Sequence, residues 1–67
     1  MIFKPGKTKN SLAAMTKRYI FILTVTPSGK YNACAIGRGY YIGFYKDISQ
    51  NASYLDAVKA CERFEGL

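Results

Sequence analysis

The chain has 67 residues, of which ten are Lys or Arg and four are Asp or Glu, so its formal net charge is +6. A chain of this length forms at most one small domain, and an apolar content of 49% argues against wholesale disorder. Two cysteines and no histidine exclude the common zinc-ligand sets, and no apolar run approaches the roughly 20 residues of a membrane-spanning helix.

Residues 1–17 are expected to form a basic N-terminal arm. The pair Pro5-Gly6 marks a turn, and no regular apolar period begins there. Met1–Phe3 is apolar enough to anchor the extreme end, whereas Ser11–Met15 has the composition of one helical turn and is too short to be stable alone. The arm is therefore expected to be ordered only in part.

The next stretch predicts a β-hairpin. Residues 18–26 are almost continuously apolar or β-branched, which is typical of a buried central strand. Pro27–Lys30 then reverses the chain, because Pro presets φ at one turn position and Gly29 accepts a positive φ at another. The partner strand is expected over residues 31–36, where two alanines on one face leave room for a helix to pack closely.

A second hairpin is expected to follow directly. Gly37–Gly39 would form its tip, and residues 40–46 would form the third strand, in which Gly43 indicates a bulge or a close backbone contact. Residues 47–52, with the sequence DISQNA, are predicted to be a polar loop.

A C-terminal helix is predicted from Tyr54 to about Glu65. Ser53 and Asp56 have the spacing of a capping box, apolar residues recur at intervals of three and four, and Gly66 stands where helices commonly end. The predicted fold class is therefore α+β: a three-stranded antiparallel sheet packed on one helix. Residues 18–67 would form a single β-β-β-α domain.

The basic charge is concentrated before the predicted helix. Residues 1–46 carry eight of the ten basic residues and none of the four acids. This asymmetry favours a polyanionic partner, because neutralised phosphates release counterions, although solubility alone accounts for many basic surfaces. One helix covers one face of the sheet, so the other face is free for binding, and alternation does not say which face it is. The candidate nucleic-acid-binding residues, drawn from the arm, the free face and the hairpin tips, are Lys4, Lys7, Lys9, Lys17, Arg18, Thr24, Thr26, Lys30, Asn32, Arg38, Tyr41 and Lys46.

The runs PSGKYNACAI, YIGFYKD and SYLDAVKAC resemble a known family of DNA-binding domains. This is the plant ethylene-response-factor type, with its relatives in the amino-terminal arm-binding domains of tyrosine recombinase integrases and in phage homing endonucleases. The matching residues are Gly29, Lys30 and Tyr31, then Tyr41, Ile42, Gly43 and Tyr45, then Ser53, Asp56, Ala57 and Ala60. The resemblance implies a three-stranded sheet whose free face lies in the DNA major groove.

The sequence departs from that family on the first strand. Where the family carries arginines that read bases, this chain has Thr24, Val25 and Thr26. A direct contact of the Arg-to-guanine kind is therefore missing there. If the protein binds DNA, phosphate contacts are expected to dominate and sequence specificity to be modest.

No catalytic constellation can be assembled from this sequence. It has no His, no Cys next to a base and no glycine loop suited to a phosphate. We therefore expect neither enzymatic activity nor a cofactor. Cys34 and Cys61 are expected to be free thiols of a soluble cytoplasmic protein, with a disulfide between them as the alternative.

A protein partner is the alternative to DNA. A short, basic, aromatic chain also suits a phage-type inhibitor or adaptor that covers an acidic or nucleic-acid-binding surface of a host protein, such as a restriction or CRISPR complex. Apolar residues of the free face, for instance Phe21 or Ile36, would then form the anchor. The chain itself is expected to be a monomer or a weak homodimer joined through an edge strand.

Overall fold

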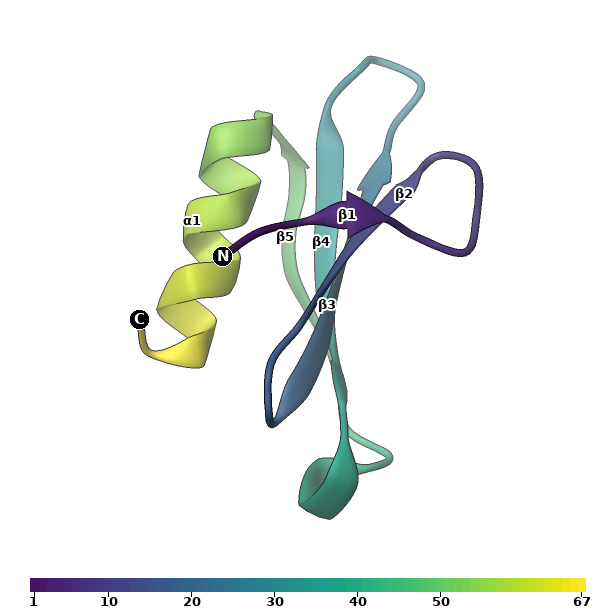
Figure 1. Ribbon diagram of the computed structural model, residues 1–67. Helices are drawn as coiled ribbons and strands as arrows, with labels where there is room; N and C mark the ends of the chain where they lie inside the picture. Colours follow the sequence, from purple (N-terminus) through teal and green to yellow (C-terminus); the bar gives the residue numbers. More distant parts are fainter.

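The computed structural model describes residues 1–67 as an antiparallel sheet with one helix packed on one of its faces (Figure 1). The elements are β1 (Lys4–Pro5), β2 (Ser11–Met15), β3 (Tyr19–Val25), β4 (Tyr31–Gly37), the 3-10 turn η1 (Gly39–Tyr41), β5 (Tyr45–Ala52) and α1 (Tyr54–Glu65). The strands lie in the sheet in sequence order, and each pairs antiparallel with the next. The α+β class is confirmed, but the sheet has five strands and not three.

The predicted first hairpin is confirmed as β3 and β4. The amide of Thr26 donates to the Lys30 carbonyl at 2.8 Å, and the amide of Gly29 donates to the Thr26 carbonyl at 2.9 Å. Gly29 has a φ of 81°, as a turn of this kind requires. β3 also lies at the centre of the sheet, with two strands on either side, as its continuous apolar run predicts.

Residues 1–17, expected to be an arm, contribute two strands to the sheet. β2 pairs along its whole length with β3, and its register sets Leu12 opposite Leu23 and Ala14 opposite Phe21. The helical turn considered for this segment is therefore wrong. The physical reason is that β3 is apolar on both faces, so its backbone needs a hydrogen-bonded neighbour on each edge.

The N-terminus is held by the helix. The Met1 amine forms an ion pair of 2.7 Å with the Glu62 carboxylate, and Met1 and Phe3 pack against the core. The expectation that the extreme end is anchored is thereby confirmed for these two residues, whereas Ile2 between them is exposed.

The third predicted strand lies at the wrong residues. The tip is not a short Gly37–Gly39 turn, because the chain runs through η1 and reaches the sheet again only at Tyr45. Gly39 and Gly43 have positive φ values of 53° and 95°, and these interrupt an extended backbone. The strand, β5, shares only Tyr45 and Lys46 with the prediction and otherwise occupies the segment DISQNA that was expected to be a loop.

β5 is a polar edge strand, which explains why its composition is loop-like. Ile48 and Ala52 pack against the core, while most of its other side chains are exposed. Its pairing with β4 contains register shifts near Ala33, and Asn51 has a positive φ of 54°. Such irregularity is common on edge strands and limits further strand pairing.

The helix and its ends are confirmed. The Ser53 hydroxyl accepts a hydrogen bond of 3.2 Å from the Asp56 amide, and Gly66 ends α1 with a left-handed φ of 95°. The buried core lies between α1 and the sheet and comprises Phe21, Leu23, Ala33, Ala35, Ala57, Val58 and Cys61. The two strand alanines let the helix approach closely, as the sequence indicated.

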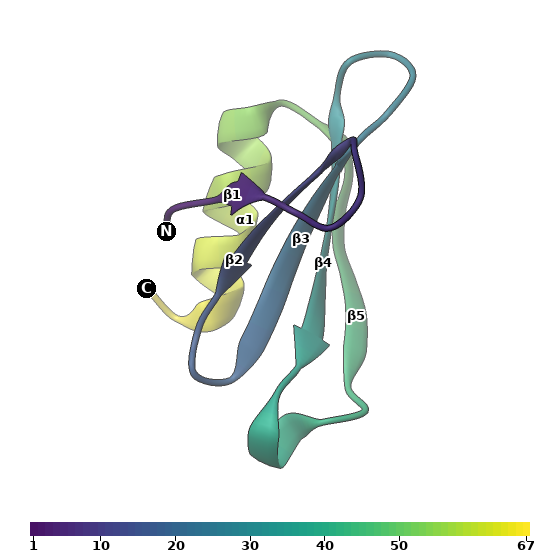
Figure 2. The same ribbon diagram turned by 45° about the vertical axis from the view of Figure 1, so that its right-hand side comes forward.

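The loops gather at the two ends of the sheet (Figures 1 and 2). The β1–β2 loop and the β3–β4 turn lie at one end, and the β2–β3 turn and η1 lie at the other. The structure contains no helix with the length and apolarity needed to cross a membrane.

Candidate functional site

The sheet face opposite α1, here called the free face, has an apolar centre. The registers of β2, β3 and β4 place together the side chains of Ala13, Met15, Ile20, Ile22, Cys34 and Ile36. The three isoleucines are half-buried, and Met15 is 64% exposed. The centre of the free face is therefore apolar, whereas the sequence predicted a polar face surrounded by lysine and arginine side chains.

A groove runs between this apolar centre and the β1–β2 loop. Its volume is about 650 Å³, and Pro5 at the end of β1 together with the loop residues Gly6, Lys7 and Thr8 forms one of its walls. In Figures 1 and 2 the loop bends away from the helix side of the sheet. The loop is held by a hydrogen bond of 2.9 Å from the Gly6 amide to the Ser11 carbonyl.

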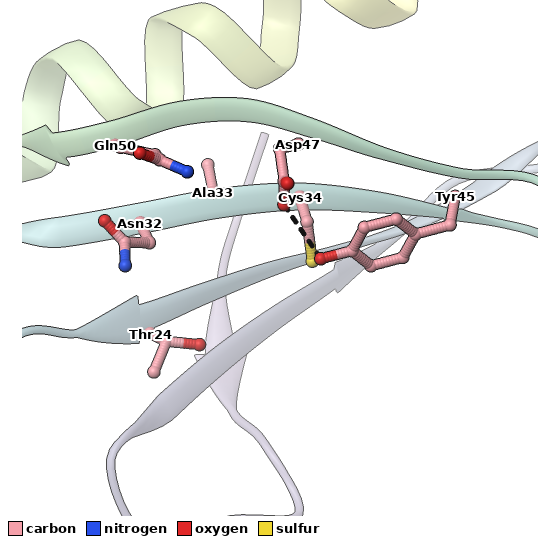
Figure 3. A pocket seen from close by; sticks show the side chains of 7 residues that line it. All are labelled: Thr24, Asn32, Ala33, Cys34, Tyr45, Asp47 and Gln50. Carbon is pink, nitrogen blue, oxygen red and sulfur yellow. Dashed lines mark hydrogen bonds between the residues drawn. The ribbon is translucent and has the colours of Figure 1, made fainter.

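The β4–β5 side of the free face holds a small polar hollow of about 230 Å³ (Figure 3). Its lining residues are Thr24, Asn32, Ala33, Cys34, Tyr45, Asp47 and Gln50. The Tyr45 hydroxyl donates to the Asp47 carboxylate at 2.8 Å, and this hydrogen bond raises the pKa of Tyr45 to about 12. The lone carboxylate of Asp47 makes the hollow unsuited to a phosphate.

Both cysteines are free thiols. Cys34 lies in the polar hollow and Cys61 lies in the core under α1, so the sheet separates them and the disulfide alternative is wrong. Burial raises the pKa of Cys34, and burial also raises the pKa of Cys61 to about 11. Both thiols therefore stay protonated and poorly nucleophilic at neutral pH.

The predicted basic residues lie at both ends of the sheet and do not form one patch. Lys7 and Lys9 in the β1–β2 loop share one end with Lys30 in the β3–β4 turn, and Lys17 and Arg38 are at the other end. All of these are exposed except Arg38, which is half-buried.

Two further lysines border the sheet on opposite sides. Lys4 lies opposite Ala13 and therefore borders the free face. Lys46 lies opposite Ala35, which is buried under α1, so Lys46 is on the helix side of the sheet. The prediction that it borders the free face is therefore wrong.

Arg18 has a structural partner. Its guanidinium donates to the Glu65 carboxylate at 2.7 and 3.0 Å and to the Glu65 carbonyl at 2.6 Å. Thr16 donates to the same carboxylate, and Arg38 donates to the Thr16 carbonyl. These bonds tie the β2–β3 turn to the end of α1, so the charge of Arg18 is neutralised within the fold.

The Arg18–Glu65 pair predicts acid-sensitive stability. Burial alone raises the pKa of Glu65, but the hydrogen bonds from Thr16 and Arg18 outweigh it and hold the pKa below its ordinary value. Ionised Glu65 therefore stabilises the fold above the unfolded-state pKa of about 4.3, and this contribution disappears as the pH falls through the lower folded-state pKa. In thermal unfolding at a series of pH values, the melting temperatures of the wild type and of Glu65→Gln should converge as the pH becomes acidic. A gap between them that stays constant down to the lowest pH would contradict this assignment.

The remaining predicted site residues are divided between surfaces. Thr24 and Asn32 line the polar hollow of the free face. Thr26 lies in the β3–β4 turn, where its hydroxyl accepts from the Lys30 amide at 3.1 Å. Tyr41 packs against Tyr19 with ring centroids 5.7 Å apart, so it belongs to the aromatic cluster near α1 and not to the free face.

The sequence did not single out several residues that the fold exposes. Ile36 is on the free face as expected, but Phe21 is a fully buried core residue and does not anchor a partner. Met15, Ile20 and Ile22 were missed. For Ile20 and Ile22 the signal was the nearly continuous apolar run of β3, which indicates apolar residues on both faces of the sheet. Met15 lies at the end of β2, which was not predicted as a strand.

The charges are largely unpaired. Apart from Arg18, no lysine or arginine lies within 4.0 Å of a carboxylate, and the other ion pair joins Met1 to Glu62. The molecule therefore presents a strong excess of free positive charge at its surface.

Comparison with protein-family models, curated proteins and solved structures finds no significant match to this chain. The resemblance to the ethylene-response-factor type of domain therefore stays a prediction. One of its motifs also has a different conformation here, because Tyr41 ends η1 and Ile42 and Gly43 lie in the loop between η1 and β5, not in a strand.

Proposed function

We propose that the protein binds nucleic acid, mainly through contacts between its loop lysines and phosphates. The observation that carries this proposal is the excess of lysine and arginine side chains without a carboxylate partner. It is combined with the absence of Asp and Glu from residues 1–46. Polyanions bind such surfaces because neutralised phosphates release their counterions.

The lysines at the loop end of the sheet are the best-placed phosphate ligands. Lys7 and Lys9 lie in the β1–β2 loop beside the free face, and Lys30 lies in the neighbouring β3–β4 turn. Each is exposed and carried on a short turn. Contacts of this type position a duplex without reading its sequence.

Direct base readout has little support on the free face. Its centre offers apolar side chains, and the side-chain amides of Asn32 and Gln50 lie on its β4–β5 side, in the same hollow as the Asp47 carboxylate. The Asn32 amide oxygen already accepts from the Asn51 amide at 2.8 Å. Binding is therefore expected to be strongly salt-dependent and only modestly dependent on sequence.

The test is a charge reversal at the loop end. In titrations of labelled duplex DNA, Lys7→Glu combined with Lys30→Glu should lower the affinity by at least about tenfold, and the slope of log K against log salt should fall by about 2. The matched control is Lys59→Glu with Arg63→Glu, which changes the net charge equally on the exposed side of α1. An equal loss from the control pair would contradict the placement of the interface. No binding by the wild type at low salt would overturn the proposal.

A second candidate is favoured by the groove on the free face. Its apolar wall, with the exposed Met15 beside Ile22 and Ile36 and with Lys7 at its rim, suits a protein surface that is apolar in the middle and acidic around it. This would be an inhibitor or adaptor function. Ile22→Asn with Ile36→Asn should then abolish a nuclease-resistant complex, while the Lys7 and Lys30 reversal should mainly slow its formation. Loss of the complex on nuclease treatment would exclude this candidate.

A further inference from the structure

The loop between β4 and β5 carries the most exposed apolar side chains of the chain. Tyr40 is 97% exposed and Ile42 is 81% exposed. Both views show η1 projecting beyond the sheet, at the end opposite the β3–β4 turn (Figures 1 and 2). We call Tyr40 and Ile42 the tip pair. Two such strongly exposed apolar side chains close together in one loop suggest a contact site.

The backbone of this loop is well constrained. The Gly37 amide donates to the Phe44 carbonyl at 2.8 Å, and the Tyr41 amide donates to the Arg38 carbonyl at 2.8 Å. Further bonds run from Ile42 to Gly39 and from Phe44 to Tyr41. The loop is therefore closed by its own hydrogen bonds, which limits how far the tip pair can fold back onto the protein.

The aromatic residues that alternate with the tip pair fasten the loop to the core. Tyr41 and Phe44 pack on Tyr19 with ring centroids 5.7 and 5.6 Å apart, and Phe44 also contacts Phe64 of α1 at 6.1 Å. Tyr40 makes an edge-on contact of 5.6 Å with Tyr41, which orients its ring. The backbone that carries the tip pair is thus preorganised, so little backbone conformational entropy is lost when it binds.

The surroundings of the loop select the chemistry of its partner. Half-buried Arg38 begins the loop and donates from one guanidinium nitrogen to the Thr16 carbonyl, but no carboxylate neutralises its charge. Exposed Lys17 lies in the adjacent β2–β3 turn at the same end of the sheet, and no acid occurs between residues 36 and 46. The nearby Glu65 is neutralised by Arg18. An apolar, partly aromatic tip flanked by free positive charge is complementary to stacked bases between phosphates.

We propose that the tip pair is a base-stacking wedge, in which the Tyr40 ring stacks on a nucleobase and Ile42 inserts beside it, with Lys17 and Arg38 facing the flanking phosphates. The proposal rests on the nucleic-acid binding proposed above and adds what kind of DNA is favoured. Stacking of this kind requires a base that is unpaired or easily unstacked. Binding should therefore be tighter to single-stranded or mismatched DNA than to a fully paired duplex of the same length.

The experiment compares Tyr40→Ala combined with Ile42→Ala against the wild type on an oligonucleotide that carries a fluorescent adenine analogue. The double variant should lose affinity by about tenfold or more at every salt concentration, because stacking contributes independently of counterion release. Its salt slope should be unchanged, and the fluorescence change of the analogue on binding should disappear. Tyr40→Phe, which keeps the ring and retains Ile42, should match the wild type in affinity and in the fluorescence change. Leu55→Ala, which removes an exposed side chain from α1, is the matched control and should have no effect.

The outcomes separate this inference from the proposed function. If the double variant binds DNA with the same affinity as the wild type, the wedge is overturned and phosphate binding is left in place. A wild type that binds neither single-stranded nor duplex DNA would overturn both. Binding of the wild type to vesicles of anionic lipid but not to DNA would likewise overturn both, and would assign the tip pair to a membrane surface.

Discussion

Replacing Phe21 with alanine is expected to leave the protein largely unfolded. Phe21 is fully buried and lies at the centre of β3, where it contacts Phe64 of α1 with ring centroids 6.1 Å apart. Removing a buried Phe ring costs about 3–5 kcal/mol. The free energy of unfolding of a chain of this length is roughly 3–10 kcal/mol. The loss caused by this one cavity is therefore comparable to the whole stability of the protein.

Urea unfolding followed by circular dichroism measures this effect. Leu55→Ala serves as the control, because Leu55 is 60% exposed on α1 and its removal should change the free energy of unfolding by less than about 0.5 kcal/mol. A Phe21→Ala protein with the same unfolding midpoint as the control would show that the helix and the sheet do not share one core.

Replacing Gly37 with alanine is expected to have the second-largest effect, and the reason is steric. A Cβ atom at this position would lie 1.8 Å from the Tyr41 carbonyl oxygen, 2.6 Å from its carbon and 3.0 Å from the Phe44 Cβ. These are mostly backbone atoms of a loop that closes through a bond from the Gly37 amide to Phe44. The loop must therefore move, at a cost of about 3 kcal/mol, at the upper end of the usual range for overpacking.

Gly39→Ala is the matched control in the same loop. A Cβ there meets nothing within 4 Å, but the φ of 53° is unfavourable for alanine, so a cost of about 1 kcal/mol is expected. Thermal unfolding should give a lower melting temperature for Gly37→Ala than for Gly39→Ala. Near-ultraviolet circular dichroism should report a disturbed tyrosine cluster only for Gly37→Ala. The reverse order would contradict the packing of this loop.

The elements that the sequence predicted well are those with local signals. The β3–β4 turn follows from Pro27 and Gly29, and the start and end of α1 follow from Ser53 and Gly66. In each case the residues that define the structure are within a few positions of one another. Their conformations therefore depend little on the rest of the chain.

The elements that were missed depend on distant partners. Ser11–Met15 has no strand signal of its own and becomes β2 because β3 offers it an edge to pair with. β5 has the polar composition of a loop and is extended because Ile48 and Ala52 reach the core beneath α1. In contrast, the aromatic run at residues 40–44 has high β propensity, but the positive φ values of Gly39 and Gly43 turn it into a projecting loop.

The sequence by itself therefore determined the fold class, the first hairpin, the capped helix and the concentration of positive charge ahead of that helix. Only the tertiary structure decided that the sheet has five strands, that its free face is apolar at the centre, and that the side chains of Tyr40 and Ile42 are exposed to solvent. The physical reason is that strand pairing and side-chain exposure depend on contacts between residues far apart in the chain, which local propensity does not encode.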